Sequence, residues 1–205
     1  STVITKAISG CTQLAGKIAD VTKAAVGNYA EYEQLVGGVE TLFKDSSDTL
    51  IGYAKKAYKT AGMSSNQYMD TATSFAASLI QGLGGDTAKA VEITNLAITD
   101  MSDNANKMGT DISSIQDAYQ GFAKQNYTML DNLKLGYGGT QSEMIRLIND
   151  SGVLGERIES LDNVTFDQMI EAIHKIQDNL GITGTTALEA GTTISGSWSS
   201  VQALF

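Results

Sequence analysis

The chain has few residues that could carry out covalent or acid–base chemistry. Its 205 residues include one histidine, His174, and one cysteine, Cys11. A Ser–His–Asp or Cys–His site would have to use this histidine as its base. His174 lies between Ile173 and Ile176 on a predicted helix, a position that favours a structural or surface histidine. No pattern brings Cys11 near it, so the sequence predicts no nucleophilic catalytic site.

Metal sites and carboxylate pairs have little support. A single cysteine excludes an internal disulfide and a cysteine-based zinc site. The spacing of Asp100, Asp103 and Asp111 is not that of a metal-binding loop. A glycosidase-like carboxylate pair stays open on numbers alone, although the spacing of most carboxylates suits a solvated helix face. We therefore predict no catalytic residue, no cofactor and no metal, and we expect that the chain is not an enzyme.

Two glycine clusters could be mistaken for phosphate-binding loops. The segment 82–87 lacks the preceding strand and the spacing of a dinucleotide fingerprint, and it lacks the lysine of a P-loop. The segment 136–140 follows one predicted helix and precedes another. We interpret both segments as hinges at which one helix stops and the next begins.

Composition and charge exclude further classes of function. The formal net charge is −9, the wrong sign for a surface that neutralises phosphates, so we predict no nucleic-acid site. The basic group of Lys55, Lys56 and Lys59 is interpreted as a solvated helix face. No apolar run approaches the ~18 residues of a membrane span. The chain starts without Met and stops at Phe205 within an apolar-periodic stretch, so we expect a fragment of a longer protein.

The elements that must position any site are predicted to be helices. Proline is absent, which favours long uninterrupted helices, and no segment alternates with a period of two. The expected fold is all-α, a globular bundle of about eight to nine helices with glycine-punctuated turns. A coiled-coil-like helix is expected within residues 1–27 and a helical module over 29–205. The second helix of the chain is predicted to begin near Asn28 and end at Gly37–Gly38.

Helix starts are marked by four capping-box patterns, in which a Ser or Thr is followed three residues later by Gln or Glu. A coiled-coil-like seam with alternating spacings of four and three residues marks the first helix. The capping boxes are 64–67, 140–143, 165–168 and 186–189, and the seam is Ile4, Ile8, Cys11, Ala15, Ile18, Thr22 and Ala25.

The run from Asp100 to Thr140 combines helical apolar spacing with many amides, aromatics and glycines. We expect two capped helices joined by short turns, with Ile112, Ile115 and other apolar residues as the packing face. Whether the large side chains here and in the last helix are core anchors or subunit-interface residues stays open. These packing candidates are Tyr119, Phe122, Tyr127, Leu130, Leu133, Tyr137 and Trp198.

This run carries a family resemblance. The stretch DMSDNANKMGTDISSIQDAYQGFAKQNYTMLDNLKLGYGGTQSEM (100–144) resembles the conserved helical module of tape measure proteins from tailed phages, of the siphophage and prophage type. Further similar stretches are 29–46, 53–90, 166–190 and 194–205, in the same order, so the resemblance covers most of the chain.

The resemblance implies a structural virion protein. Such a protein occupies the tail tube, sets tail length during assembly and is released ahead of the DNA at infection. The implied partners are tail tube subunits, tail assembly chaperones and the distal tail protein complex, with self-association in the tube. The implied location is the lumen of the virion tail, and the host cytoplasm during assembly. Lytic domains found elsewhere in some relatives have no counterpart in these motifs.

Two other classes remain as alternatives. One is an ejection protein associated with a cell-wall hydrolase, which a peptidoglycan-clearing assay would detect. The other is a helical secreted effector or membrane-active protein, which liposome flotation would test. The second would need a basic or strongly apolar helix face, and the charge of −9 argues against it.

Overall fold

The computed structural model describes residues 23 and 25–192, and this part of the chain contains helices and no strand. The all-α prediction is therefore confirmed. Seven α-helices run from the first helix to α7, close to the predicted number, and a short helix follows over 185–192. The elements are the first helix (25–43), η1 (Lys44–Ser46), α2 (Ser47–Thr60), α3 (Ser65–Gly82), α4 (Thr87–Met108), α5 (Ile112–Ala123), η2 (Leu130–Leu133), α6 (Gln141–Ser151) and α7 (Phe166–Asn179).

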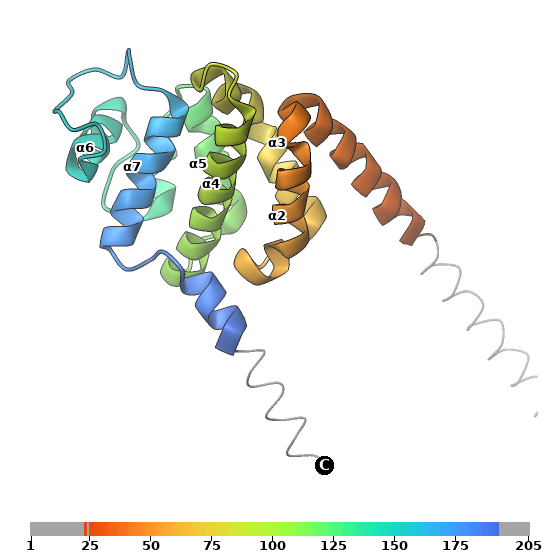
Figure 1. The fold of residues 1–205 in the computed structure, drawn as a ribbon. Helices are drawn as coiled ribbons and strands as arrows, with labels where there is room; N and C mark the ends of the chain where they lie inside the picture. The colour runs from red at the N-terminus through yellow and green to blue at the C-terminus, as the bar shows by residue number, and fades with distance from the viewer. Residues whose placement is uncertain (1–22, 24, 193–205) are drawn as a thin grey trace, which may run out of the picture.

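Helix α4 is the centre of the bundle. It contacts α2, α3, α5 and α7, and Figure 1 shows it between the α2–α3 side and the α6–α7 side. Its sequence is apolar on more than one side, as a helix surrounded by neighbours requires. We call residues 47–182, which contain α2 to α7, the body. Buried apolar side chains from each of these helices join into one core. In this core the ring centroids of Phe75 and Phe166 lie 5.7 Å apart in an edge-to-face arrangement.

Three of the four predicted caps lie at helix starts. The box at Ser64 is complete, because Gln67 N donates to Ser64 Oγ at 3.2 Å and Ser64 N donates to Gln67 Oε1 at 3.1 Å. Thr165 N likewise donates to the Gln168 side chain at 3.0 Å. At Thr140 only the forward bond forms, from Glu143 N to Thr140 Oγ1 at 3.2 Å.

The fourth predicted cap is wrong. The helix begins at residue 185, so Thr186 lies inside its first turn rather than before it. The backbone N–H of Thr186 donates to the Asp103 carboxylate of α4 at 2.9 Å. A side chain from another helix has therefore taken over the capping role that local sequence assigned to Thr186.

The first helix is longer than predicted at its C-terminal end. It continues without a break from residue 25 to residue 43, past the expected boundary near Asn28 and the expected stop at Gly37–Gly38. Val39 and Phe43, beyond the glycines, are fully buried. Packing of these side chains offsets the helix penalty of about 1 kcal/mol per glycine. The predicted boundary between 1–27 and 29–205 thus falls within one continuous helix.

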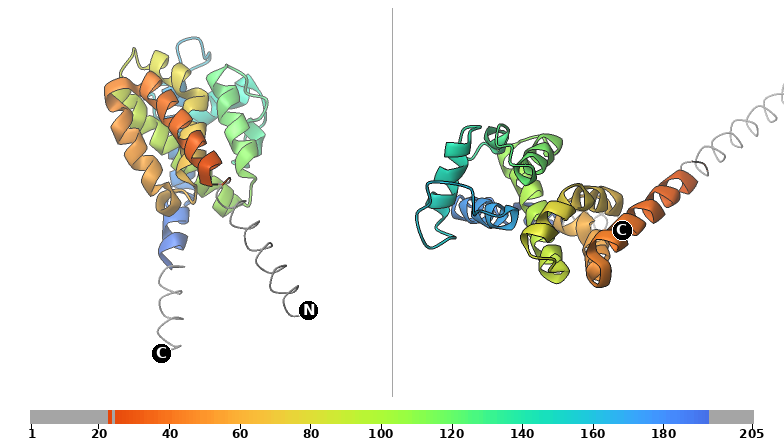
Figure 2. Two further views of the ribbon diagram at one scale, coloured as in Figure 1. Left: turned by 90° about the vertical axis from the view of Figure 1, so that its right-hand side faces the viewer. Right: turned by 90° about the horizontal axis from the view of Figure 1, so that it is seen from above.

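The apolar face of the first helix repeats with alternating spacings of three and four residues, in register with the predicted seam. Near the C-terminal end of this helix Val39 and Phe43 are buried, whereas Tyr29 toward its N-terminal end is 64% exposed. Figures 1 and 2 show this helix leaving the body at its side. The seam residues of this helix are Ala25, Tyr29, Tyr32, Val36, Val39 and Phe43.

The run 100–140 contains one capped helix after α4 instead of two. Asp111 caps α5 by accepting from Ser114 N at 3.1 Å, but the next element is the 3-10 helix η2, which has no side-chain cap. The chain turns back at Gly121, whose carbonyl accepts from Asn126 N at 2.8 Å. A Cβ at residue 121 would lie 2.9 Å from the Asn126 carbonyl oxygen, so this turn requires glycine.

Candidate functional site

The large side chains singled out in the sequence lie mostly in the core. Tyr119, Phe122 and Tyr127 are buried and form a row of rings with centroid separations of 5.7 and 6.3 Å. Leu130 and Leu133 are buried beside them. These five are core anchors in the structure, not surface contacts. Tyr137 is only partly buried, and Trp198 lies outside the described residues.

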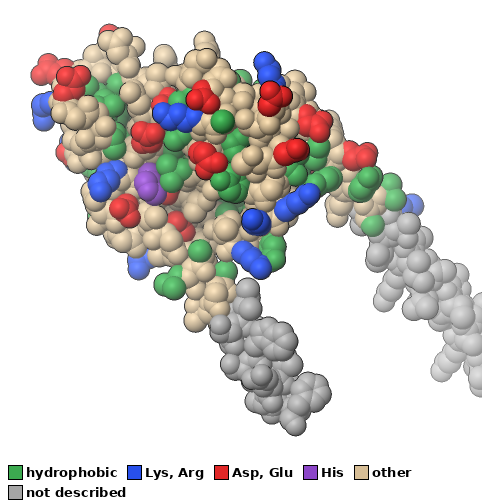
Figure 3. All heavy atoms as spheres, viewed as in Figure 1, with side chains coloured by type: hydrophobic (Ala, Val, Ile, Leu, Met, Phe, Trp, Pro, Cys, Tyr) green, Lys and Arg blue, Asp and Glu red, His purple; other side chains and the backbone are tan. Residues whose placement is uncertain are grey.

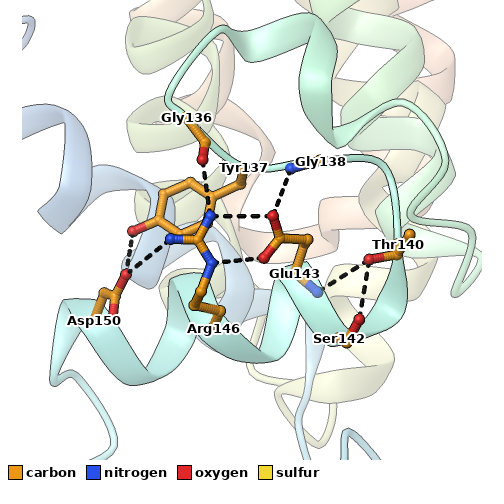
Figure 4. A network of polar contacts seen from close by, with 8 residues as sticks. All are labelled: Gly136, Tyr137, Gly138, Thr140, Ser142, Glu143, Arg146 and Asp150. Atoms are coloured by element: carbon orange, nitrogen blue, oxygen red, sulfur yellow. Dashed lines mark hydrogen bonds and ion pairs between the residues drawn. The ribbon is translucent and has the colours of Figure 1, made fainter.

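Tyr137 belongs to a surface cluster with Glu143, Arg146 and Asp150, shown in Figure 4. The Arg146 guanidinium lies over the Tyr137 ring, with Cζ 4.2 Å from the ring centroid. It bonds to the Glu143 carboxylate at 2.5 Å and to the Gly136 carbonyl at 2.8 Å. The Tyr137 hydroxyl donates to Asp150 at 2.6 Å.

This Tyr137 cluster fastens the loop before α6 to the helix itself. Hydrogen bonds from Arg146 and from the Gly138 N–H lower the pKa of Glu143 to about 2. Burial and the bond to Asp150 raise the pKa of Tyr137 to about 12. Nε and Nη2 of Arg146 are hydrogen-bonded within the cluster and Nη1 lies 3.7 Å from Asp150 Oδ2, so the Nε–Nη2 edge that could hold a carboxylate or phosphate is already used by Glu143.

A second polar cluster is buried between α4 and α7. We call Asp100, Asp103, Asn104, His174 and Gln177 the α4–α7 network. The first three stand at i, i+3 and i+4 on α4, and the other two at i and i+3 on α7, so each set lies on one helix face. All except His174 are buried. Buried polar groups of this kind must be hydrogen-bonded to be tolerated.

Asn104 is the hub of the network. Its Nδ2 donates to the Leu133 carbonyl at 2.9 Å and to Gln177 Oε1 at 2.8 Å. Its Oδ1 accepts from the Thr110 hydroxyl at 2.8 Å. Gln177 Nε2 continues the chain of bonds to the Asp100 carbonyl at 3.1 Å. One fully buried amide therefore ties α4, α7, η2 and the α4–α5 turn together.

Asp103 holds the start of the helix over 185–192. Its two carboxylate oxygens accept from Gly184 N at 2.8 Å and Thr186 N at 2.9 Å. A carboxylate at a helix N-terminus is favoured by the unsatisfied N–H groups and by the helix dipole. Asp103 thus supplies from α4 the cap of this helix, in place of a cap from the helix's own sequence.

Asp100 and His174 form a paired acid and base. The His174 Nδ1 lies 2.9 and 3.0 Å from the two Asp100 oxygens. The Asp100 side chain is 1% exposed and that of His174 is 31% exposed, and the histidine reaches the surface in Figure 3. The hydrogen bond to Asp100 raises the pKa of His174. Burial raises the pKa of Asp100, and the bond from His174 opposes that rise.

We predict that stability falls as the pH rises through the folded-state pKa of His174. Because this pKa is raised, the contribution of protonated His174 is fully present below the unfolded value of about 6.5 and is lost as the pH rises through the higher folded value. Urea unfolding from about pH 6 to pH 9 should show the decline. His174→Asn keeps a donor for Asp100 but cannot titrate, so its profile should be flatter. Equal slopes in both proteins would contradict the prediction.

The Asp–His pair alone does not make an active site. A dyad of this kind needs a nucleophile, a bound water on a metal or a substrate pocket at the other ring nitrogen. Within residues 23 and 25–192, no group of three His, Cys, Asp or Glu side chains could hold a metal ion. In the structure, His174 is a partly exposed partner of the buried Asp100 carboxylate.

Sequence reasoning missed the network although one signal was available. Asp100, Asp103 and Asn104 sit within α4, whose sequence is apolar on more than one side, so at least part of this polar stripe had to be buried. Gln177 carried no comparable signal, because its partner Asn104 is 73 residues away.

The described part of the chain also carries an open groove. It has a volume of about 710 Å³ and lies between the first helix and the start of α3.

No helix in the described ranges is long and apolar enough to cross a bilayer. Comparison of the chain with protein-family models, curated proteins and solved structures gives no match.

Proposed function

We propose that the chain is a structural, non-enzymatic module of a phage tail tape measure protein. The observation that carries the proposal is the way the first helix joins the body. This helix is anchored in the core by Val39 and Phe43 and then continues outward, with its seam in register, to the exposed Tyr29. A folded unit that passes directly into a projecting helix suits a long helical protein with folded modules along it.

The helix over 185–192 supports the same proposal at the other end of the body. It begins at the buried carboxylate of Asp103 and leads away from the body, in the view of Figure 1 at its lower side. Leu188 on this helix is exposed. We propose that tail tube subunits, assembly chaperones, the distal tail complex and other copies of the chain are its partners, in the tail lumen and in the host cytoplasm during assembly.

The folded body is proposed not to serve as the measuring element. A helix advances about 1.5 Å per residue, so a length-setting segment must stay extended. Between residues 44 and 184 the chain instead reverses repeatedly, and its longest helix, α4, has 22 residues, or about 33 Å. Residues folded back in this way do not add length in proportion to their number.

In-frame deletions in the full-length protein test the proposal. Removing residues from a long helical region should shorten the tail by about 1.5 Å per residue. Deleting the body, residues 47–182, should instead prevent assembly or change the length by far less than this rule requires. Electron microscopy of tails gives the lengths. Assembled tails about 200 Å shorter, the value expected for 136 extended residues, would show that the body measures length. If tails were normal in the absence of the whole protein, the proposed tail function would be wrong.

A further inference from the structure

The open groove between the first helix and α3 is lined by aromatic and acidic side chains. Tyr29, Glu31 and Tyr32 form part of one wall, and Asp70 stands on the other wall, on α3. Both carboxylates are exposed, and Tyr29 is 64% exposed. The volume of about 710 Å³ lies within the range of roughly 300–1,000 Å³ that is typical of ligand sites. The groove therefore has room for several side chains of a partner.

Hydrogen bonds hold the walls of this groove without using its carboxylates. Asn66 Nδ2 on α3 donates to the backbone carbonyl of Asn28 on the first helix at 3.5 Å. Ser65 Oγ donates to a backbone carbonyl of α2 at 3.1 Å. Among the described residues, neither the Glu31 nor the Asp70 side chain has a hydrogen-bond or ion-pair partner. Both carboxylates are thus available to a ligand.

The charge on the two walls has one sign. Residues 25–43 include Glu31, Glu33 and Glu40 but no Lys or Arg, and α3 includes Asp70 but no Lys or Arg. Figure 3 shows acidic side chains on the first helix where it leaves the body. Charges within about 8–10 Å of a ligand act on it at physiological salt. The groove therefore attracts a cationic group and repels an anionic one.

The Tyr137 cluster shows which cation such side chains hold. There a tyrosine ring and two carboxylates, those of Glu143 and Asp150, surround the guanidinium of Arg146. The groove offers tyrosine rings and two unpaired carboxylates without an arginine among its lining residues. A guanidinium suits this set because its planar fork stacks on a ring while it pairs with a carboxylate.

We propose that this groove binds an arginine-bearing segment of a partner protein. The guanidinium lies against the ring of Tyr29 or Tyr32 and pairs with Glu31 or Asp70, and the neighbouring residues of the segment lie along the open groove. Such binding is independent of the proposed tail function, because only the side chains and the charge of the groove are needed for it.

A titration of the labelled 205-residue chain with acetyl-Gly-Arg-Gly-amide tests the site by proton–nitrogen NMR. The amide signals of Tyr32, Asn66 and Asp70 should shift in a saturable way. The dissociation constant should be in the millimolar range, as expected of one cation–π contact and one exposed ion pair. Acetyl-Gly-Lys-Gly-amide should bind more weakly, because an ammonium group cannot form the forked pair. Acetyl-Gly-Gln-Gly-amide should not bind.

Two matched pairs of variants locate the binding. Glu31→Gln and Tyr29→Leu should each weaken binding about two- to fivefold. Glu40→Gln removes the same charge from the same helix about 13 Å further along its axis, beyond the Debye length of about 8 Å, and should have little effect. Tyr58→Leu replaces a tyrosine of similar exposure, 61%, on α2 and should also have little effect. Circular dichroism checks that all four variants stay folded.

Four results would overturn the inference. They are the absence of saturable shifts at millimolar peptide, equal binding of the arginine peptide and either of the other peptides, equal effects within a matched pair, and occupation of the groove by Arg157 of a second copy. In the last case the signals would change with protein concentration in the native chain but not in Arg157→Gln. Tail lengths are measured independently, so failure of the groove is distinguishable from failure of the proposed tail function.

Discussion

Replacing Gly139 by alanine is expected to lower the free energy of unfolding by about 3 kcal/mol or more. A Cβ at residue 139 would lie 2.9 Å from the carbonyl carbon of Thr128 and closer still to its oxygen. These are backbone atoms, which cannot rotate away as a side chain could, so the loop before α6 would have to move. For a chain of this size the loss corresponds to a melting temperature about 6–12 °C lower, measured by circular dichroism at 222 nm.

The neighbouring glycine supplies the control. A Cβ at Gly138 would meet only the Glu143 side chain, at 3.6 Å, which is an ordinary contact. Gly138→Ala should therefore change the free energy of unfolding by no more than about 0.5 kcal/mol. If the two variants melted at the same temperature, the close approach of Gly139 to Thr128 would not exist in solution.

Replacing Asn104 by alanine is expected to cost about 2–4 kcal/mol, for a different reason. The change removes one buried side chain and leaves three partners without their bonds, namely the Leu133 carbonyl, the Gln177 amide oxygen and the Thr110 hydroxyl. Each buried polar group left without a partner costs about 1–3 kcal/mol, less where it finds another. Urea unfolding gives the free energy, and an unchanged m-value would indicate that the unfolded state is unaffected.

Asn106 is the matched control on the same helix. It is exposed, two residues beyond Asn104. Asn106→Ala exchanges the same side chain without breaking the network, and alanine has the higher helix propensity. It should therefore be neutral or slightly stabilising. A cost for Asn104→Ala as small as that for Asn106→Ala would mean that the α4–α7 network contributes little to stability.

The helices could be predicted because their signals are local. The capping box of Ser64 and Gln67 spans four residues and forms as expected. The central place of α4 likewise follows from apolar residues on several of its faces. Such features depend on side chains within one or two turns of each other, so the sequence alone contains the information.

The errors arise where distant residues override local preference. Gly37 and Gly38 favour a helix end, yet burial of Val39 and Phe43 carries the helix onward. Thr186 has a suitable cap sequence, yet Asp103, 83 residues earlier, provides the cap. The need for glycine at residue 139 also depends on a distant element, because Thr128 approaches only after the turn that follows α5. None of these partners can be identified from spacing along the chain.

The two hydrogen bonds between Asp103 and the start of the helix over 185–192 also have a mechanical consequence. A tension applied at the C-terminal end of this helix would act on the backbone that leads back to α7. It would also act, through the N–H groups of Gly184 and Thr186, on Asp103, which lies on the central helix of the bundle. The load would then spread over the four helices that contact α4. Part of a pull on this helix would therefore reach the centre of the bundle as well as α7.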